Sequence, residues 1–449
     1  MKRFENTAGV LAPDILLPKA GTDMAKWAVV ACDQFTSQPE YWRETEEIVG
    51  DAPSTLRLML PEMYLDKPGE AERIAAINAT MEQYLDAGVL ESKGEGFVYV
   101  RRTAGGNTRS GLIVALDLEQ YDYSRGSTTL IRATEGTIVA RIPPRLRIRK
   151  DAPVELPHIL VLIDDPARTV IEPIGESVTE ADKLYDFDLM QNGGHVAGWM
   201  VKDEARVNAA LRALEALCDP ALFREKYGAE QPPLLFAMGD GNHSFATAKA
   251  NWEEKKQTLS PAEREEHPAR YALVELENVH DSGIVFEPIH RVLFDLDVEG
   301  SIAWLENKLA ADNGGCKTFR FPTKDERDGA MRARMEACNC HLLPFVTADG
   351  FGFFQVEKPA AQLEVGTLQN ALDDMLKAMP GATIDYIHGE DVVNDLGSKA
   401  NNMGFLLPPM SKSAFFKTVI FDGALPRKTF SMGEANEKRY YLECRKIMK

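Results

Sequence analysis

The sequence predicts an α+β protein. Strand-like apolar runs are mixed with amphipathic helical segments, without the regular spacing of a doubly wound parallel sheet. A length of 449 residues suits two or three domains, and 44% hydrophobic with 27% charged residues is typical of a globular chain. The pattern of predicted strands and helices changes near residue 295. We therefore expect one α+β region over 1–295 and a second over 296–449 packing on it.

Apolar runs and helical periodicity define the elements of the first region. Strands are predicted at 27–31, 97–101, 111–116, 158–163, 271–276 and 284–286, with 128–131 and 138–142 extending the same sheet. Helices are predicted at 38–49, 69–88 and 204–217, the last with Val207, Leu211 and Leu214 in phase. Ser260 followed by Pro261 is a typical helix start.

The second region is also predicted to contain both helices and strands. Helices are expected near 300–312, 326–337 and 366–378, and strands near 341–346, 351–357 and 440–444. Neither a P-loop nor a Gly-x-Gly-x-x-Gly fingerprint is present, so a nucleotide site would be built in another way.

The charge balance restricts the partners. A net charge of −18, from 51 basic and 69 acidic residues, opposes binding to nucleic acid and to anionic membranes. No apolar run reaches membrane-spanning length, and no apolar core follows the basic N-terminus, so we expect a cytoplasmic protein. The oligomeric state is not predicted.

Two clusters invite a ligand interpretation. One is a basic patch that suits a small anion, or is a strand with solvated side chains; it consists of Arg141, Arg145, Arg147, Arg149 and Lys150. Cys338-Asn339-Cys340-His341 has zinc-like residues but lacks a second ligand pair, and the six cysteines show no disulfide framework.

The segment 234–249 carries the strongest functional signal. An apolar run ends at Gly239-Asp240-Gly241, and Asn242, His243 and Ser244 then open an alanine-rich helix. Glycine lets a ligand approach the backbone, and the exposed N–H groups and dipole of a helix start favour phosphate.

Each polar side chain of this turn has a chemical role open to it. Asp240 would hold a metal ion or accept a proton, and His243 would act as acid–base catalyst or phosphate ligand. The alternative is structural, because Asp-Gly and Gly-Asn are common turn dipeptides and Asn or Ser is an ordinary helix cap.

At Asp240-Gly241-Asn242-His243-Ser244-Phe245 the chain resembles the domain-of-unknown-function 1015 family, whose usual signature is Asp-Gly-His-His-Arg-Tyr. Further resemblances follow in the same order along the chain: Asp33, Thr134-Glu135-Gly136-Thr137, Arg145, His195 with Trp199, Pro288-Ile289-His290-Arg291, 405–409 and 426–430. The signature is also similar to the phosphate-binding box of the ParB/sulfiredoxin superfamily, which includes kinases of free serine. The resemblance therefore implies a mixed-sheet ParB/sulfiredoxin-like core and a nucleotide phosphate at the turn.

The resemblance assigns roles to residues that pattern alone leaves open. Asp240, His243 and Glu135 would be catalytic, with Glu135 as the base. Phosphate ligands would be Gly239, Gly241, Asn242, Ser244, Arg145, His290, Arg291 and Lys428, and the substrate would meet Asp33 and His195. The structural alternatives are an ion-paired Glu135, a structural turn at His290-Arg291, a loop position for His195, a strand-end cap at Asp33 and an exposed Lys428.

The chain departs from the family pattern inside the turn itself. Asn242 replaces the first His and Ser244 replaces the Arg, whose planar fork binds phosphate in a way that Ser does not reproduce. Arg145, Arg291, Lys249 or Lys428 would then supply the charge, or the ligand differs, or catalysis is lost.

Two functions from different classes follow. The first is a phosphotransferase that uses ATP or ADP with Mg²⁺ and acts on a small hydroxylated metabolite such as an amino acid. The second is a nucleotide-binding switch or regulator with little or no turnover. A DNA-partition role is opposed by the charge and by the lack of a basic recognition helix.

Overall fold

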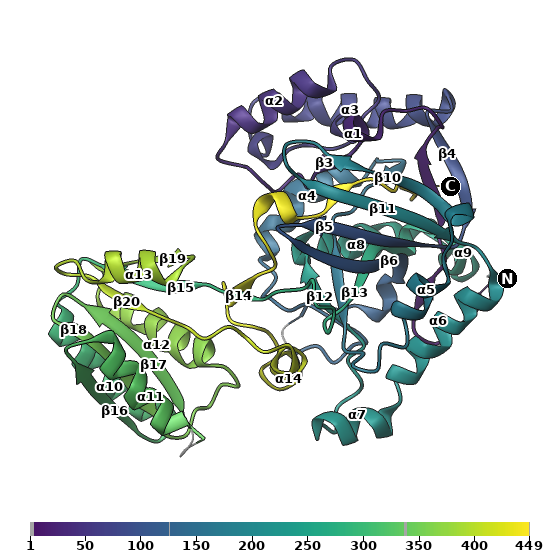
Figure 1. Cartoon of the computed structure of the whole chain (residues 1–449). Coiled ribbons are helices and arrows are strands. Elements are labelled where there is room, and N and C mark those ends of the chain that lie inside the picture. Colours follow the sequence, from purple (N-terminus) through teal and green to yellow (C-terminus); the bar gives the residue numbers. More distant parts are fainter. Residues whose placement is uncertain (1–3, 125, 336–338, 449) are drawn as a thin grey trace. The chain divides into compact units, whose positions relative to one another are not determined.

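The computed structural model describes residues 4–124, 126–335 and 339–448. The chain forms two compact units, Met1–Val285 with Met432–Lys449, and Phe286–Ser431. The boundary expected at 295 thus falls inside the second unit, and residues 432–449 belong to the first unit instead of the C-terminal region. Figure 1 shows the elements of both units.

The first unit is built on a large mixed sheet. The strands of this unit, in the main sheet and outside it, are β1 (Val10–Leu11), β2 (Asp14–Pro18), β3 (Val29–Val30), β4 (Leu90–Glu95), β5 (Phe97–Ala104), β6 (Asn107–Asp117), β7 (Ile131–Arg132), β8 (Val154–Glu155), β9 (Leu160–Ile163), β10 (Lys183–Leu189), β11 (Gly194–Val201), β12 (Phe236–Asp240), β13 (Tyr271–Asn278), β22 (Tyr440–Tyr441) and β23 (Arg445–Lys446). Nine described strands form the main sheet, in the order β10-β11-β5-β6-β13-β9-β12-β7 with β1 on β6. The β13–β9 and β12–β7 pairs are parallel and the other pairs antiparallel, which confirms a mixed sheet.

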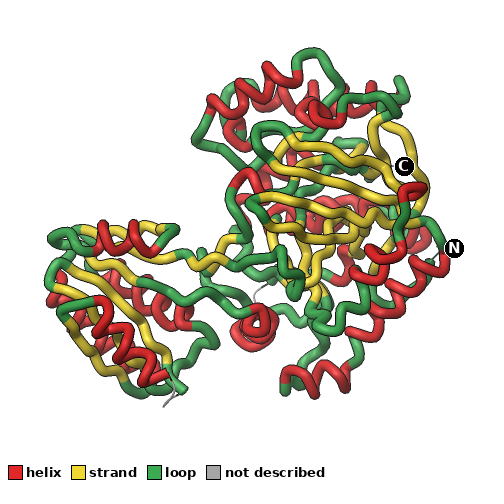
Figure 2. The backbone as a smooth tube through the Cα atoms, viewed as in Figure 1, coloured by secondary structure: helices red, strands yellow, loops and turns green. Residues whose placement is uncertain are grey.

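Helices cover both faces of this sheet (Figure 2). They are α1 (Met24–Trp27), α2 (Pro39–Val49), α3 (Glu70–Asp86), α4 (Ile142–Arg149), α5 (Glu172–Ser177), α6 (Glu204–Leu217), α7 (Pro220–Tyr227), α8 (Asn242–Lys255) and α9 (Pro261–Glu266). The predicted helices at 38–49, 69–88 and 204–217 are confirmed, and each buries apolar residues along one side.

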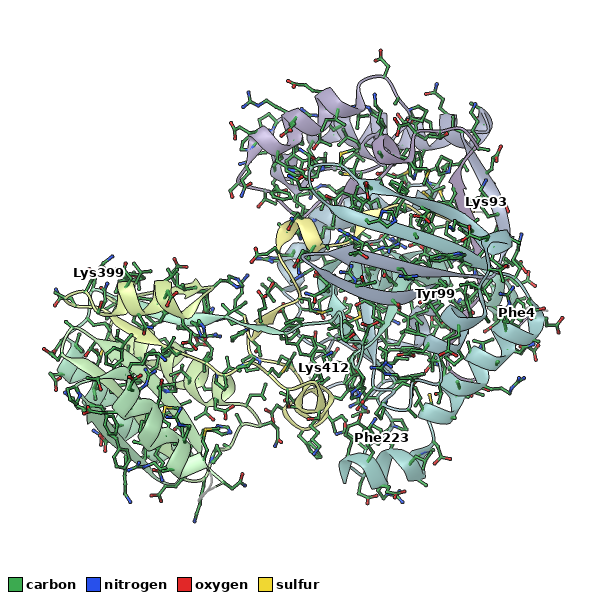
Figure 3. All side chains as sticks on the ribbon, viewed as in Figure 1. Phe4, Lys93, Tyr99, Phe223, Lys399 and Lys412 are labelled. Carbon is green, nitrogen blue, oxygen red and sulfur yellow. The ribbon has the colours of Figure 1, made fainter. Side chains whose placement is uncertain are left out.

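Alternate residues of the central strands enter two separate cores. On β5, Phe97 and Tyr99 pack in one core, and Val98 and Val100 pack in the other. Successive side chains point to opposite faces of a strand, so a continuous apolar run is what a sheet covered on both faces requires. Figure 3 labels Tyr99 among the side chains of this layer.

Two predicted strands are wrong. Residues 139–141 form a 3-10 turn that leads into α4, and 284–286 precede β14 (Glu287–Pro288) without being a strand. Pro143 and Pro144 explain the first error: they lack an N–H for a sheet but fit the first turn of a helix, where that N–H has no partner.

The second unit has its own sheet, in the order β16-β18-β17-β20-β15-β19. Its elements are β14, α10 (Val298–Asn313), α11 (Lys324–Met335), α12 (Glu364–Ala378), α13 (Glu390–Gly397), α14 (Lys412–Asp422), β15 (His290–Phe294), β16 (Cys316–Phe321), β17 (His341–Thr347), β18 (Gly350–Val356), β19 (Thr383–Ile387), β20 (Met403–Phe405) and β21 (Phe430–Ser431). Pairing of β14 with β21 joins the residues at which the chain enters and leaves this unit.

The last residues return to the first unit through two short strand pairs. β22 pairs with β3, and β23 pairs with β8. This return brings Lys438 and Tyr441 to the turn that follows β12. No described helix combines the length and apolarity needed to cross a bilayer.

Candidate functional site

The turn after β12 is the start of α8, as the sequence predicts. Gly241 is the residue before the helix and has φ 80°, in the left-handed region that favours glycine. A Cβ added at Gly241 would lie 3.1 Å from the Cα atom of Ile159. Both the backbone conformation and the close approach of a neighbouring segment therefore require glycine at this position.

The first turn of α8 presents amide groups without acceptors. Phe245 donates its N–H to the Gly241 carbonyl at 2.9 Å, but no described group accepts the N–H of Asn242, His243 or Ser244. Unpaired N–H groups at the positive end of a helix dipole attract anions. Phosphate binding at this turn stays a prediction.

The Asn242 side chain is engaged by a neighbouring loop. It is 8% exposed, accepts the Thr134 N–H at 3.1 Å and lies 3.3 Å from the Thr134 hydroxyl as a donor. Its amide is thus occupied by the loop 133–138. That loop carries Glu135, whose side chain is exposed, to the edge of the turn.

His243 is held neutral by its surroundings. Its Nε2 accepts the Ile138 N–H at 3.3 Å. Burial, and then the positive charges of Arg141 and Arg145, lower the pKa of His243 to about 4. Arg141 has no ion-pair partner among the described residues, so its guanidinium is available to an anion.

Asp240 is paired with a cation. Its Oδ2 lies 3.1 Å from the Lys438 ammonium, and its Oδ1 accepts the Gly241 N–H at 2.8 Å. Burial would raise the pKa of Asp240, but the charges of Lys438 and His158 outweigh it and the pKa is lowered. The described residues contain no group of three His, Cys, Asp or Glu that could hold a metal, and the role of Asp240 as a metal ligand stays a prediction.

His158 lies at the centre of a polar cluster that joins the turn to distant segments. Its Nε2 is 3.3 Å from the Ser244 hydroxyl and 3.7 Å from Asp33, and its Nδ1 is 2.8 Å from the Tyr441 hydroxyl. Asp33, which the sequence offered as a substrate contact, therefore meets the turn through His158. Because the serine and the carboxylate face the same ring nitrogen, the cluster lacks the relay geometry of a hydrolytic triad.

A cavity of about 140 Å³ adjoins this cluster. Ser244, Thr247, His158 and Tyr441 line it, together with an apolar majority. Arg145 also lines it, but its guanidinium is ion-paired with Glu62, so the phosphate charge expected of Arg145 is already partly neutralised.

A family model described as a protein of unknown function (DUF1015) matches residues 16–374. The chain belongs to the DUF1015 family. The match includes the turn and Asp33, whereas Lys428, Lys438 and Tyr441 lie beyond its end. No curated protein matches this DUF1015 chain.

Solved structures resemble the DUF1015 chain only distantly. A conserved hypothetical protein from Pyrococcus furiosus is 11% identical with a TM-score of 0.33, covering 74% of this chain and 90% of that one. A free serine kinase in complex with AMP is 9% identical with a TM-score of 0.37, and a mutant of a free serine kinase in complex with ADP is 9% identical with a TM-score of 0.38. Each of these two covers 75% of this chain and 92% of that one.

Several expected ligands of the DUF1015 chain belong to the second unit. His290 is 2% exposed and accepts the Leu407 N–H at 3.0 Å through Nδ1. Arg291 is fully buried and donates to Gln369, Ile289 and Arg427, while burial lowers its pKa to about 10. These contacts are structural ones within the unit. Lys428 is exposed, with φ 55°.

His195 is separated from the turn within the sheet. It lies on β11, with four strands between β11 and β12, and its two ring nitrogens are each 2.7 Å from a carboxylate, Asp188 and Asp186. Its side chain is 43% exposed. The expected substrate contact is thus an exposed histidine between two aspartates.

Sequence reasoning missed His158, Lys438 and Tyr441. No motif surrounds them, and only the pairing of β22 with β3 brings the last two to the turn. Arg141 was visible as part of the arginine cluster. Lys249, one of the alternative cations, donates to the Leu118 carbonyl and pairs with Glu253, and Cys338 lies outside the described residues.

Proposed function

We propose that the DUF1015 chain binds the phosphates of ATP or ADP at the first turn of α8 and transfers a phosphoryl group to a small hydroxylated metabolite. The observation that carries the proposal is the set of three unpaired amides at Asn242, His243 and Ser244, beside the free Arg141 guanidinium. Phosphoryl transfer asks mainly for positioning and charge neutralisation, which backbone amides and cations supply.

The adjoining cavity supports the same proposal. Ser244 belongs both to the amide turn and to the cavity wall, so a hydroxyl held in the cavity would lie next to a phosphate held by the amides. The similarity of the turn to the ParB/sulfiredoxin phosphate box is a second support. The proposal also includes a ParB/sulfiredoxin-like core and a cytoplasmic location. Nucleotide and metabolite are the proposed partners.

The proposed step is a displacement at phosphorus. The acceptor oxygen forms a bond to the transferred phosphorus, and the bond from that phosphorus to the nucleotide oxygen breaks. The acceptor proton passes to a carboxylate, for which Glu135 and Asp33 are the candidates. Because Asp240 is occupied by Lys438, no step is derived through a metal, and Mg²⁺ enters only as the companion of the nucleotide.

Nucleotide binding is tested first. Calorimetry with ATP, ADP and AMP, with and without Mg²⁺, should give binding that weakens about tenfold in Arg141→Gln, because a charge-assisted hydrogen bond contributes roughly 1.5 kcal/mol or more. Arg101→Gln is the matched control, since Arg101 is an exposed arginine on β5, with three strands between β5 and β12. Equal affinities of both variants and the parent would contradict phosphate binding at this turn.

Transfer is tested second. Labelled ATP is incubated with the chain and a panel of hydroxylated metabolites. Glu135→Gln and Asp33→Asn should identify the base through a loss of about 100- to 10,000-fold in rate with nucleotide binding retained. Full transfer by both variants would remove the carboxylates from the mechanism.

A nucleotide-binding switch is the second candidate. Asn242 and Ser244 stand where the family signature has His and Arg, and their side chains are engaged by Thr134 and His158. Binding through backbone amides tolerates these replacements better than catalysis does. Nucleotide binding that changes the oligomeric state in light scattering, with no turnover, would favour the switch over the kinase.

A further inference from the structure

The cavity beside α8 carries information about the acceptor. It has a volume of about 140 Å³, and its wall is mostly apolar, with contributions from Leu58, Met59, Leu60, Met81, Ile148 and Val154. A cavity of comparable size, roughly 150 Å³, holds a benzene molecule in an engineered protein. The space therefore suits an apolar body of about six carbon atoms.

The charged groups of the wall are already neutralised by one another. Arg145 pairs with Glu62, and the exposed fractions of their side chains are 17% for Arg145 and 20% for Glu62. Glu155 pairs with Arg149 and also with Arg445 at 2.8 Å. All four charged residues among the described lining residues, Glu62, Arg145, Arg149 and Glu155, thus have a partner of opposite charge.

The polar groups that remain are suited to a hydroxyl. Ser244, His158 and Tyr441 form a chain of hydrogen-bonding groups along the wall, at 3.3 Å and 2.8 Å. A zwitterion would bring a carboxylate and an ammonium into this space without free counter-charges, and burying unpaired charges is costly. A single hydroxyl would instead extend the existing hydrogen bonds.

We propose that the cavity takes a neutral acceptor with an apolar body of about six carbons and one hydroxyl, in place of a zwitterionic amino acid. The hydroxyl lies at Ser244 and His158, and the body lies among the apolar side chains. The role as acceptor rests on the proposed phosphotransferase function, whereas binding to the cavity does not.

Binding is measured on the full chain by ligand-observed NMR, with benzyl alcohol, toluene and L-serine as probes. Benzyl alcohol should bind up to about tenfold more tightly than toluene, the gain of a net hydrogen bond, and Ser244→Ala should reduce that preference. L-serine should not displace benzyl alcohol from the cavity. Displacement by L-serine, or absence of benzyl alcohol binding, would overturn the inference.

Two variants locate the probe. Val154→Phe and Ala152→Leu each enlarge a residue that lines the cavity, and each should weaken or abolish benzyl alcohol binding. Ala152→Leu carries the test if Val154→Phe fails to fold by circular dichroism. Unchanged affinity in a folded cavity variant would place the probe elsewhere and overturn the inference.

A third variant tests the charge argument. Glu62→Gln leaves Arg145 without its partner, so benzoate should bind at least about tenfold more tightly than to the parent chain. Glu40→Gln is the matched control, because it removes the partner of Arg43 at an exposed pair outside the cavity. Unchanged benzoate affinity in Glu62→Gln would contradict the neutralised wall.

The outcomes separate this inference from the proposed function. Benzyl alcohol bound at the cavity without any nucleotide binding would leave the inference standing and remove the kinase. Nucleotide binding together with L-serine in the cavity would leave the kinase standing and overturn the inference.

Discussion

Asn242 illustrates how a single residue at the turn serves the site indirectly. Its buried amide holds Thr134, and through it the loop that carries Glu135. In the proposed phosphate site the ligands at this position are backbone amides, so the proposal does not require the family His here. Ser244 is similar, since its hydroxyl faces His158 while its N–H is free.

Asn242→Ala should lower the free energy of unfolding by about 1–3 kcal/mol, because the Thr134 N–H loses its acceptor in a buried place. Asn251→Ala is the control on the same helix, since the Asn251 amide is 1% exposed and has no hydrogen-bond partner among the described residues. Urea titrations should give the smaller loss for Asn251→Ala. Equal losses would mean that packing, and not the hydrogen bonds, sets the cost.

His243 gives a prediction about pH. Its pKa in the folded state, about 4, lies below the ordinary value of 6.5. The unfolded chain therefore takes up the proton first, and stability is lost as the pH falls from about 6.5 towards 4. His243→Gln should reduce this loss in thermal melts. In NMR the ring should stay neutral at pH 6, whereas His195, whose pKa is raised by hydrogen bonds to Asp188 and Asp186, should titrate above its ordinary range.

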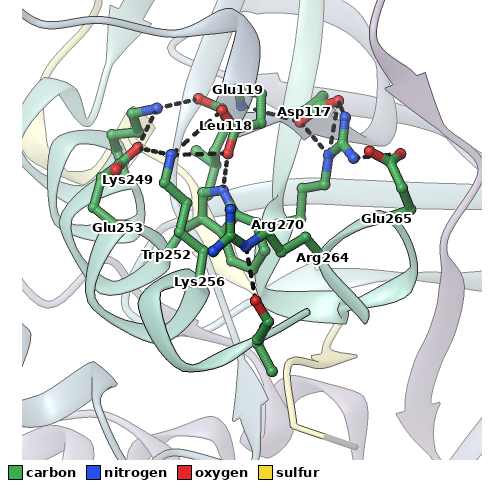
Figure 4. A network of polar contacts seen from close by, with 11 residues as sticks. Asp117, Leu118, Glu119, Lys249, Trp252, Glu253, Lys256, Arg264, Glu265 and Arg270 are labelled. Atoms are coloured by element: carbon green, nitrogen blue, oxygen red, sulfur yellow. Dashed lines mark hydrogen bonds and ion pairs between the residues drawn. The ribbon is translucent and has the colours of Figure 1, made fainter. Parts of the chain in front are cut away.

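At the scale of elements, α8 is anchored along its length. Figure 4 shows the network around its C-terminal half, where Lys256 bridges Glu253 and Glu119 at 2.7 and 3.1 Å and Lys249 reaches the Leu118 carbonyl. Trp252 donates from Nε1 to Glu119 in the same network. These contacts hold the C-terminal half of α8 to the segment 118–119.

Gly241→Ala should destabilise the chain by more than Gly228→Ala. Both glycines are left-handed, at φ 80° and 68°, and an alanine there costs about 1–2 kcal/mol. Only at Gly241 would the new methyl group also meet Ile159, since nothing lies within 4 Å of a Cβ at Gly228. Thermal melts measure the difference, and calorimetry should find weaker phosphate binding in Gly241→Ala alone.

At the scale of the whole molecule, the first unit is closed by the last residues of the chain. Arg439 is buried and pairs with Glu275 on β13 and with Glu443, while Arg445 pairs with Glu155 on β8. The same segment supplies Lys438 and Tyr441 to the turn. Residues 438–445 therefore contribute both to the packing of the first unit and to the site.

Arg439→Met should cost about 3–5 kcal/mol of unfolding free energy, because it leaves Glu275 and Glu443 as buried charges without their shared partner. Arg43→Met, at an exposed pair with Glu40, should cost less than about 1 kcal/mol. Denaturant titrations compare the two variants. A small loss in Arg439→Met would show that the C-terminal segment is held by its strand pairs instead.

The sequence by itself determined the elements whose signals are local. The strand, glycine turn and helix at 236–255, the helix at 204–217 and the capped start at Ser260 follow from periodicity and capping chemistry within a few residues. The tertiary structure alone decided which side chains meet at the turn. His158, Lys438 and Tyr441 come from segments between about 80 and 200 residues away from it, and strand pairing brings them together. It also decided that Arg291 is a buried structural residue, since burial depends on contacts that no local pattern records.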